Sequence, residues 1–420
     1  MNALSSKIQL PADWKWTKLG EVCQTTSGGT PSRRELKYYD GKIPWVKSGE
    51  LDRGIITDTE EKISEEAIKN SSAKVFPKGT LLIALYGATI GKLAFLGVNA
   101  ATNQAICGIY KNENIDSHFL YNYLFYKKQK LVNQGIGGAQ PNISQTILKN
   151  LDIPLPPKPT QQAIVFKIEE LFSELDKGIE NLHTAQQQLK TYRQSVLKWA
   201  FEGKLTHENV KEGELPKGWK WVKMSNLIEK PKYGTSKKCE YEIKGVGVLR
   251  IPNIVKGIVD SEDLKFAKFD NQEIETYSLK DGDILTIRSN GSVDIVGKCA
   301  LITKKDEGFL YAGYLIRLRP LQSLILPKYL LNILSSINLR NQIEGKAKST
   351  SGVNNINSEE LAGLNISLPP NIEEQHDIVQ AIESRLSVAD KMEESITQSL
   401  HQAEALRQSI LKKAFEGRLV

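Results

Sequence analysis

Two long runs of the chain carry apolar residues at three- and four-residue steps on a polar background. The first run extends over about residues 160–202 and the second over about residues 373–416. This spacing predicts amphipathic α-helices, because residues three and four positions apart share one helix face. Paired prolines precede each run, and Gly203 and Gly417 follow where a helix commonly ends. We therefore expect two helices of about 60 Å, each with one face to bury.

The two runs end in nearly the same sequence. Residues 194–205 read QSVLKWAFEGKL and residues 408–419 read QSILKKAFEGRL, so nine of twelve positions are identical at an offset of 214 residues. A second matching pair, LPADWKWTKL at 10–19 and LPKGWKWVKM at 215–224, lies ahead of each run. The chain is therefore an internal duplication. Two copies related by a two-fold axis across the helices run antiparallel, which predicts an antiparallel coiled coil; a plain dimerising coiled coil is the alternative.

The regions between these constant segments contain short apolar runs, glycine turns and one late helical pattern each, which predicts α+β domains. We expect a tandem duplication of an α+β domain, each copy followed by its long helix, with pseudo-two-fold symmetry. The expected bounds are a first domain at 1–155, its helix at 156–204, a second domain at 205–370 and its helix at 371–420.

Some elements within the domains are also predicted. The helical patterns lie near residues 119–132 and 327–342. Trp14 alternates with Trp16, and Trp219 with Trp221, as on a strand with both rings on one face. We interpret these tryptophans as anchors of the core, with contact to a ligand as the alternative.

One apolar segment, residues 80–101, is long enough to suggest a membrane span. Its counterpart at 283–302 carries Arg288, Asp294 and Lys298, which a membrane would accept only at high cost. We interpret both segments as buried strands joined by a glycine turn. The N-terminal sequence has no apolar signal region, and four scattered cysteines indicate neither a disulfide framework nor a zinc site. These features predict a cytoplasmic protein without membrane contact.

A search for enzymatic machinery finds none. The sequence GATIGKL at 87–93 is one residue short of a Walker A motif and ends in leucine, and no GxGxxG follows a strand. The five histidines are scattered, and none lies beside a plausible nucleophile. We expect no catalytic residue, no cofactor and no metal in this chain. The net charge of +7 has the sign that a polyanion binder needs, although it is weak support alone.

Polar loops rich in Gly, Asn, Gln, Ser and Lys interrupt each domain and precede each long helix. Such loops are either surface connections or places where amides, hydroxyls and cations read base edges and bind phosphates. The candidate DNA-binding residues of the first domain are Thr30, Ser32, Arg33, Arg34, Lys47, Ser48, Tyr86, Thr89, Lys92, Asn103, Gln104, Gln140 and Asn142. Those of the second domain are Tyr233, Thr235, Ser236, Lys237, Lys238, Arg250, Asn253, Arg288, Ser289, Asn290, Lys298, Lys346, Lys348 and Ser349. Asn290 with Gly291 is also the sequence of a hairpin turn, which can present Arg288 to a groove.

The combination of these motifs resembles one known family over nearly the full length. LPxxWxW openings, GGTPSR with IPWVKSGEL, YGTSKK with LRIPNI and RSNGS, proline junctions and AFEGKL or AFEGRL endings are similar to specificity subunits of type I restriction-modification enzymes. The resemblance implies two target recognition domains, each reading one half of a bipartite asymmetric double-stranded DNA site. It also implies two methylation subunits that bind S-adenosylmethionine and methylate adenine, and restriction subunits that join for cleavage.

The alternative from another class is an interaction scaffold, with two peptide-binding domains on a coiled coil. The two interpretations differ in an easily measured property. Specific affinity for duplex DNA that falls steeply with salt supports the first, and salt-insensitive or absent DNA binding supports the second.

Overall fold

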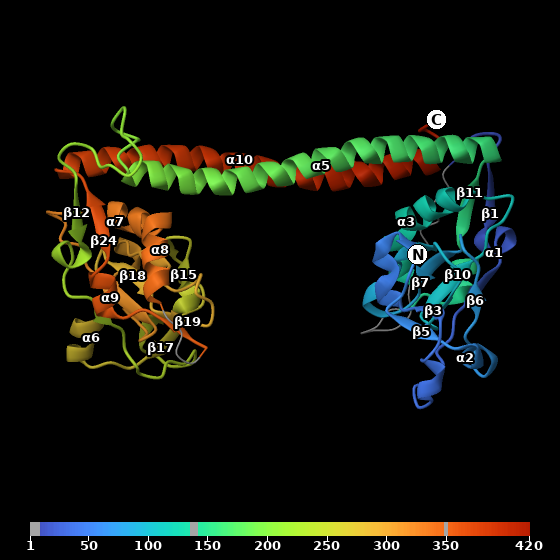
Figure 1. Ribbon diagram of the computed structural model, residues 1–420, viewed down its shortest axis with the longest axis horizontal. Coiled ribbons are helices and arrows are strands. Elements are labelled where there is room, and N and C mark those ends of the chain that lie inside the picture. Colours follow the sequence, from blue (N-terminus) through green and yellow to red (C-terminus); the bar gives the residue numbers. More distant parts are fainter. Residues whose placement is uncertain (1–8, 135–141, 348–351) are drawn as a thin grey trace. The chain divides into compact units, whose positions relative to one another are not determined.

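The computed structural model describes residues 9–134, 142–347 and 352–420, which form two compact units (Figure 1). Unit 1 contains the chain up to residue 182 together with residues 398–420, and unit 2 contains residues 183–397. Each unit is thus one α+β domain with a part of both long helices. Unit 1 therefore contains residues from both ends of the chain, because the end of the second long helix packs into the core of the first domain.

Unit 1 contains a five-stranded sheet, a four-stranded sheet and a strand pair. The five-stranded sheet has the order β2 (Thr25–Ser27), β10 (Ile106–Ile109), β7 (Leu81–Ala84), β8 (Leu93–Leu96) and β4 (Ile55–Ile56). The four-stranded sheet has the order β5 (Glu61–Ile63), β3 (Ile43–Val46), β9 (Ala100–Thr102) and β6 (Val75–Phe76). The strand pair consists of β1 (Lys15–Lys18) and β11 (Asp152–Leu155). Its helices are α1 (Leu19–Val22), α2 (Glu65–Lys69), α3 (Ser117–Gln134), α4 (Gln145–Lys149) and parts of α5 (Lys158–Phe201) and α10 (Ile372–Phe415).

Unit 2 repeats this plan with smaller sheets. Its four-stranded sheet has the order β13 (Lys232–Tyr233), β22 (Leu315–Leu318), β18 (Ile284–Ile287) and β20 (Cys299–Leu301). Its three-stranded sheet has the order β17 (Lys265–Ala267), β14 (Val246–Leu249) and β21 (Leu310–Tyr311). The remaining strands form the pairs β12 (Lys220–Lys223) with β24 (Asn365–Leu368), β15 (Ile254–Val255) with β16 (Ile258–Val259), and β19 (Ser289–Asn290) with β23 (Asn354–Asn355). Its helices are α6 (Asn271–Tyr277), α7 (Pro327–Leu334), α8 (Ile337–Lys346), α9 (Ser358–Ala362) and the remaining parts of α5 and α10.

The apolar segment that suggested a membrane span and its counterpart in the second repeat both contain buried strands, as predicted. Strand β7 pairs antiparallel with β8, and β18 pairs antiparallel with β20. Every residue of β7 and β18 is buried, which explains why their sequences are continuously apolar or nearly so. Within residues 9–134, 142–347 and 352–420, no helix combines the length and the apolar sequence needed to cross a membrane.

Two local predictions are wrong. The helical pattern near 327–342 is interrupted: α7 ends at Leu334, and Ser336 caps a separate helix α8 by accepting a hydrogen bond from the backbone of Leu339. The side chain of Trp221 is 55% exposed and is no core anchor, whereas Trp219, which precedes strand β12, is buried. Alternation along the strand therefore did not identify which face meets the core.

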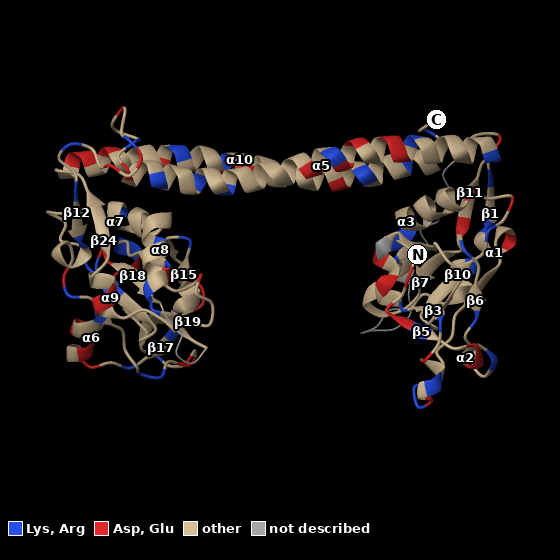
Figure 2. Ribbon diagram, viewed as in Figure 1, with Lys and Arg blue, Asp and Glu red and all other residues tan. Residues whose placement is uncertain are grey.

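Helices α5 and α10 lie side by side and run antiparallel, as predicted (Figure 1). In unit 2, Arg193 of α5 donates to Asp390 at 2.6 Å and to Glu393 at 2.8 Å, both on α10. In unit 1, Arg407 of α10 pairs with Asp176 of α5. Arg193 corresponds to Arg407, and Asp176 to Asp390, at the offset of 214 residues between the repeats. The same ion pair therefore forms twice, once with the arginine on α5 and once with the arginine on α10. Figure 2 shows both signs of charge interspersed along the two helices.

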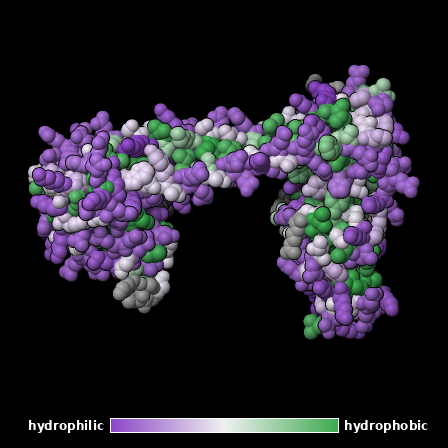
Figure 3. Space-filling model, turned by 45° about the horizontal axis from the view of Figure 1, so that its top comes forward, coloured by the Kyte–Doolittle hydropathy of each residue, from purple (hydrophilic) through white to green (hydrophobic). Residues whose placement is uncertain are grey.

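The apolar stripes of the two helices are only partly covered by each other. Tyr192, Met392 and Leu406 belong to these stripes, yet their side chains are 37, 52 and 51% exposed. Figure 3 accordingly shows hydrophobic side chains, in green, along the surface of the paired helices. Ala389 and Ala403 of the second stripe are buried, and the ends of the helices enter the two domain cores. The expectation that each stripe would be buried is wrong for the three exposed positions.

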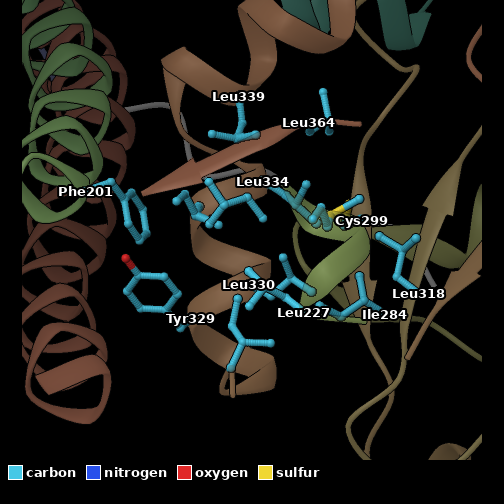
Figure 4. Packing of buried hydrophobic residues seen from close by; sticks show 14 of the residues in the cluster. Phe201, Leu227, Ile284, Cys299, Leu318, Tyr329, Leu330, Leu334, Leu339 and Leu364 are labelled. Atoms are coloured by element: carbon cyan, nitrogen blue, oxygen red, sulfur yellow. The ribbon is translucent and has the colours of Figure 1, made fainter. Parts of the chain in front are cut away.

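The end of each long helix inserts a phenylalanine into a domain core. Phe201 of α5 packs edge-to-face on Tyr329 of α7, with ring centroids 5.2 Å apart (Figure 4). Phe415 of α10 packs in the same way on Tyr123 of α3 at 4.9 Å. Both tyrosine hydroxyls donate to a backbone carbonyl of the strand that precedes a long helix, at 2.6 and 2.8 Å. Burial raises the pKa of both tyrosines, so they act as neutral donors.

A glycine turn closes each long helix in the same way. Gly203 and Gly417 have φ values of +76° and +68°, in the left-handed region that favours glycine. A Cβ atom at Gly203 would lie 2.2 Å from Pro216, and one at Gly417 would lie 2.3 Å from Pro11. The turn at Gly417 therefore packs on Pro11 in the same way as the turn at Gly203 packs on Pro216.

This equivalence predicts that the chain tolerates circular permutation. A variant whose original ends are joined directly, so that residues 418–420 and 1–10 link Gly417 to Pro11, and whose new start lies near Val210 is expected to fold with an unchanged melting temperature. The reason is that the cut falls in an exposed linker, and the new join has 13 residues where the linker between Gly203 and Pro216 has 12. Circular dichroism and thermal unfolding measure the outcome. A permutant opened within β18, whose residues are all buried, is the negative control; complete failure of the Val210 permutant to fold would contradict the prediction.

Candidate nucleic-acid interface

In unit 2, the chain that leaves the central strand β18 pairs with the chain that enters helix α9. The two strands β19 and β23 place Ser289 opposite Asn355 and Asn290 opposite Asn354. We call these four residues the unit 2 ribbon. Backbone pairing leaves their amide and hydroxyl side chains to project from the ribbon. The prediction of a hairpin turn at Asn290 and Gly291 is wrong, because Asn290 lies in β19 and pairs with the distant strand β23. Its Oδ1 accepts from the backbone N–H of Ser292 at 3.0 Å.

Arg288 lies immediately before this ribbon. Its guanidinium carbon lies 4.6 Å from the ring centroid of Tyr233, and its Nε donates to Oδ1 of Asn355 at 3.3 Å. The hydroxyl of Tyr233 accepts a hydrogen bond of 3.0 Å from the backbone of Ser358, at the start of α9. Arg288 makes no ion pair with any residue in the described part of the chain. A guanidinium held on an aromatic ring keeps N–H groups for guanine O6 and N7, or for a phosphate.

Unit 1 contains the same ribbon in a shorter form. Tyr86, which follows β7, forms an antiparallel bridge with Asn142, and this pair is the unit 1 ribbon. The backbone N–H of Ile143 donates to the carbonyl of Leu85 at 2.9 Å, just as Ile356 donates to the carbonyl of Arg288 in unit 2 at 2.8 Å. Leu85 is fully buried. The two units therefore present different side chains on an equivalent backbone.

Most of the cationic candidates are paired with carboxylates of the same unit. The pairs are Arg33 with Glu61 (2.5 Å), Lys47 with Glu60 (2.8 Å), Lys92 with Asp52, Lys237 with Glu273 (2.7 Å), Lys238 with Glu240 (2.7 Å) and Arg250 with Asp263 (3.1 Å). The hydrogen bond from Arg33 lowers the pKa of Glu61, which stays ionised. Four candidates make no ion pair among the described residues: Arg34, Arg288, Lys298 and Lys346. Surface pairs contribute little stability, so the paired cations can exchange a carboxylate for a phosphate at low cost.

Arg33 is held in unit 1 much as Arg288 is held in unit 2. Its guanidinium lies 4.3 Å from the ring centroid of Tyr39 and 5.1 Å from that of Trp45. The difference is that Glu61 compensates the charge of Arg33. Both arginines are therefore fixed in orientation, and only Arg288 offers an uncompensated charge.

Two candidates are buried and serve the fold, so the structure removes them from the set. Thr235 is 5% exposed and Asn253 is 1% exposed. The Nδ2 of Asn253 donates to the backbone carbonyls of Asp260 and Asp263, at 2.8 and 2.9 Å. Its amide is thus used inside the domain, because the loop after β16 needs these carbonyls satisfied.

Other polar candidates lie in loops or, like Ser48 and Thr89, in short 3-10 helices of the two units. Thr30 donates to the side chain of Gln104, and Oδ1 of Asn103 accepts from the backbone of Ala105 at 3.2 Å. Four further polar candidates are exposed or half-buried: Ser32, Ser48, Thr89 and Ser236. Gln140, Lys348 and Ser349 lie outside the described residues.

The sequence interpretation missed Asn354 and Asn355, although they belong to a loop that was singled out. A comparison of the two repeats contains the signal. Asn142-Ile-Ser and Asn355-Ile-Asn match at an offset of 213, and their last residues cap α4 and α9 by accepting from backbone N–H groups at 3.1 and 2.8 Å. The asparagine that precedes each cap lies in a ribbon.

The chemistry that these sites offer is hydrogen bonding and charge. Burial raises the pKa of the thiols of Cys23, Cys107 and Cys299 to about 11, so they are poor nucleophiles at neutral pH. In the described ranges, no three His, Cys, Asp or Glu side chains gather as metal ligands. Amide, hydroxyl and guanidinium groups on a two-stranded ribbon match what base edges in the major groove require.

Comparisons with known proteins agree with this chemistry. A family model described as the type I restriction modification DNA specificity domain matches the chain twice, over residues 11–189 and 216–402. The chain is 28% identical over 422 residues to the specificity subunit of type I restriction enzyme EcoKI from Escherichia coli (strain K12), covering 98% of this chain and 90% of that protein. It is 27% identical over 425 residues to the StySPI specificity subunit from Salmonella potsdam, with the same coverage.

Solved structures share the fold. A chain from a study of complex assembly and conformational transition of the type I R-M system has a TM-score of 0.76, with 21% identity and coverage of 98% of this chain and 99% of that one. The HsdS subunit from Thermoanaerobacter tengcongensis has a TM-score of 0.60 at the same identity and coverage. The two family matches begin at the two equivalent prolines, Pro11 and Pro216, and together span most of the sequence. The chain therefore belongs to the family of type I restriction-modification DNA specificity proteins.

Proposed function

We propose that this chain is the DNA-binding specificity subunit of a type I restriction-modification complex, and that each unit reads one half of a bipartite, asymmetric duplex site. The observation that carries the proposal is the ribbon that occurs in both units with different side chains. Equivalent backbones give both units the same way of approaching DNA. Different side chains on them give the two half-sites different sequences, as an asymmetric site requires.

The ribbons suit the major groove, which admits a two-stranded element. Asn354 and Asn355 offer the amide geometry that pairs with adenine, and Arg288 offers the pair of donors that guanine accepts. Lys298, which lies opposite the end of β18, is placed to bind a neighbouring phosphate, since its ammonium has no carboxylate partner in the described residues. In unit 1, Tyr86 and Asn142 take the corresponding positions.

Catalysis in such a complex belongs to other subunits, since the specificity subunits of this family are not catalytic. We propose that two methylation subunits, which bind S-adenosylmethionine and methylate adenine, assemble with this chain, and that restriction subunits join for cleavage. The chain itself holds no cofactor in this proposal. Its role is to place each methylation subunit beside the half-site that one unit reads, in the cytoplasm where the DNA lies.

The proposed function is tested by DNA binding of the chain assembled with its methylation subunits. Sequencing of methylated adenines in a host that carries the whole system identifies the site. Affinity for that duplex is then compared with affinity for a scrambled duplex as salt increases. A protein that makes 6–10 phosphate contacts is expected to lose roughly 10³–10⁵ in affinity between 50 and 200 mM salt. Binding that is absent or insensitive to salt would refute the proposal and favour a peptide-binding scaffold.

Arg288 provides a residue-level prediction. Arg288→Ala is expected to weaken binding to the specific duplex by about 1–3 kcal/mol and to relax the preference at one base pair of one half-site. The matched variant Arg288→Lys keeps the charge and loses the paired donors, so it should relax the same base pair while keeping most of the affinity for unrelated DNA. Competition binding with duplexes substituted at each position measures both effects. An equal loss on every sequence would show that Arg288 contacts a phosphate.

A further inference from the structure

Besides Tyr233, a second exposed tyrosine lies beside Arg288 in unit 2. Strand β18 pairs with β22 in a register that sets Ile287 opposite Leu315, so the next pair outward is Arg288 and Tyr314. The backbone N–H of Arg288 donates to the carbonyl of Tyr314 at 3.0 Å, which continues this pairing. Residues directly opposite each other on antiparallel strands project from the same face, with Cβ atoms about 4.5–5.5 Å apart. Arg288 and Tyr314 therefore share one face at the end of the two strands.

The backbone that carries Tyr314 is fixed on both sides. The N–H of Gly313 donates to the carbonyl of Thr235 at 2.7 Å, and the carbonyl of Leu315 accepts from the N–H of Gly234 at 3.2 Å. A tyrosine side chain has only two rotatable angles, so it makes a large contact at a low cost in conformational entropy. Because its backbone is also fixed, Tyr314 offers its ring in a restricted set of positions.

The side chain of Tyr314 is available for contact with a ligand. Tyr314 is 64% exposed, and its side chain makes no hydrogen bond or ring contact with any residue in the described ranges. An exposed aromatic residue elsewhere on a protein surface would need no explanation. Here the ring lies on the face that carries Arg288, whose guanidinium is held on Tyr233 and has no carboxylate partner among the described residues. An uncompensated cation and an uncovered ring therefore occur together at the proposed reading surface.

Unit 1 has neither of these side chains at the equivalent places. Leu85 occupies the position of Arg288, and its backbone N–H donates to the carbonyl of Ala105 at 2.8 Å, as Arg288 donates to Tyr314. Leu85 is fully buried and Ala105 is half-buried. The shared fold therefore requires neither an arginine nor a tyrosine at this pair. Side chains that differ between the units on an equivalent backbone are the ones expected to distinguish the two half-sites.

A ring beside a guanidinium matches two features of the major groove. Guanine presents two acceptors to arginine, and thymine presents an apolar group, its C5 methyl. An aromatic ring that covers this methyl group removes apolar surface from water, which favours binding. The Cβ atoms of opposite residues are about 4.5–5.5 Å apart, compared with about 3.4 Å for each base pair. If Arg288 reads a guanine, the ring of Tyr314 lies at a neighbouring base pair.

We propose that Tyr314 is a specificity-determining residue, and that its ring contacts the C5 methyl group of a thymine in the base pair next to the guanine read by Arg288. This inference rests on the proposed function and names one further base of a half-site. The half-site of unit 2 then contains a guanine and a thymine in adjacent base pairs. Unit 1, which has Ala105 at this place, reads its half-site without this contact.

Deoxyuridine tests the contact directly, because it pairs as thymidine does and lacks only the C5 methyl group. The chain is assembled with its methylation subunits, and fluorescence anisotropy measures its affinity for the specific duplex and for duplexes with one thymidine at a time replaced. The half-site of unit 2 is identified as the one whose preference relaxes in Arg288→Ala. One replacement in that half-site is expected to raise the dissociation constant about 4-fold, which corresponds to about 0.8 kcal/mol for one buried carbon group.

Variants of Tyr314 assign the effect to its ring. Tyr314→Ala is expected to raise the dissociation constant for the unmodified duplex about 10-fold and to abolish the effect of that deoxyuridine, since the ring that covers the methyl group is gone. Tyr314→Phe keeps the ring and should keep the 4-fold effect. Tyr241→Ala is the matched control, because this tyrosine of unit 2 is 58% exposed and its ring lies against Lys265; it should keep the 4-fold effect. All three variants should keep their melting temperature, since both tyrosines are exposed.

Three outcomes would overturn the inference and leave the proposed function standing. In the first, no deoxyuridine in the half-site of unit 2 weakens binding. In the second, the deoxyuridine effect persists at full size in Tyr314→Ala, so that another side chain covers the methyl group. In the third, Tyr314→Phe loses as much affinity as Tyr314→Ala, which would assign the contact to the hydroxyl and a phosphate. An assembled complex that prefers no duplex sequence would overturn the proposed function itself.

Discussion

Phe415→Ala is expected to destabilise unit 1 by about 3–5 kcal/mol, and Phe201→Ala to destabilise unit 2 by a similar amount. Both rings are 3% exposed and pack on a buried tyrosine of the adjacent domain. Removing either ring leaves a cavity that the surrounding helices and strands cannot fill without shifting. The effect should be confined to one unit, because each phenylalanine belongs to the core of one unit alone.

Hydrogen exchange measured by mass spectrometry tests both the size and the place of the effect. Phe415→Ala should reduce protection in β7 and β10 and leave β18 and β22 unchanged, and Phe201→Ala should do the reverse. Phe166→Ala is the matched control, because this phenylalanine of α5 is 71% exposed and its loss should cost about 0.5 kcal/mol or less. Equal loss of protection in both units after one substitution would contradict the prediction.

Lengthening both long helices by four residues is expected to abolish methylation at the original site and to move it to a site with a longer spacer. The insertions belong at equivalent positions, after Leu182 in α5 and after Ile396 in α10. Four residues add about 6 Å to a helix, compared with about 3.4 Å for each base pair. If α5 and α10 set the distance between the half-sites, the unread spacer grows by about one or two base pairs.

Sequencing of methylated adenines in a host with the lengthened subunit measures the spacer directly. An insertion in α5 alone is the control, because it displaces Arg193 from Asp390 and Asp176 from Arg407 and should reduce assembly rather than select a new spacer. An unchanged spacer after insertion in both helices would show that the helices do not set it, and would leave the reading surfaces of the two units unaffected.

The internal comparison of the sequence determined much of the architecture. The repeated AFEG endings and the three- and four-residue apolar steps predicted α5 and α10 within two residues of their bounds. The same duplication predicted antiparallel helices, which the equivalent pairs Arg193–Asp390 and Arg407–Asp176 confirm. These features are accessible from sequence because they depend on local periodicity and on the comparison of one repeat with the other.

The candidate site was accessible only in part. Arg288, Ser289 and Asn290 were identified because their cationic, hydroxyl and amide groups suit base edges and phosphates, while the asparagines opposite them, more than sixty residues later, were not. Asn253 has the side chain of a base reader and is used inside the domain, because two carbonyls of the loop after β16 accept hydrogen bonds from its amide. Composition shows which groups are available, and only the fold shows which of them are already bonded.

By itself, then, the sequence determined that the chain is a duplicated α+β protein with two antiparallel helices, since repetition and periodicity are written along the chain. The tertiary structure decided which distant segments meet: the end of α10 enters the core of the first domain, Trp221 faces solvent, and each ribbon joins a segment from the middle of a domain sequence to one near its end. The reason is physical. A helical or strand pattern identifies a face to be buried, but the partner of that face is selected by long-range packing, which no local pattern records.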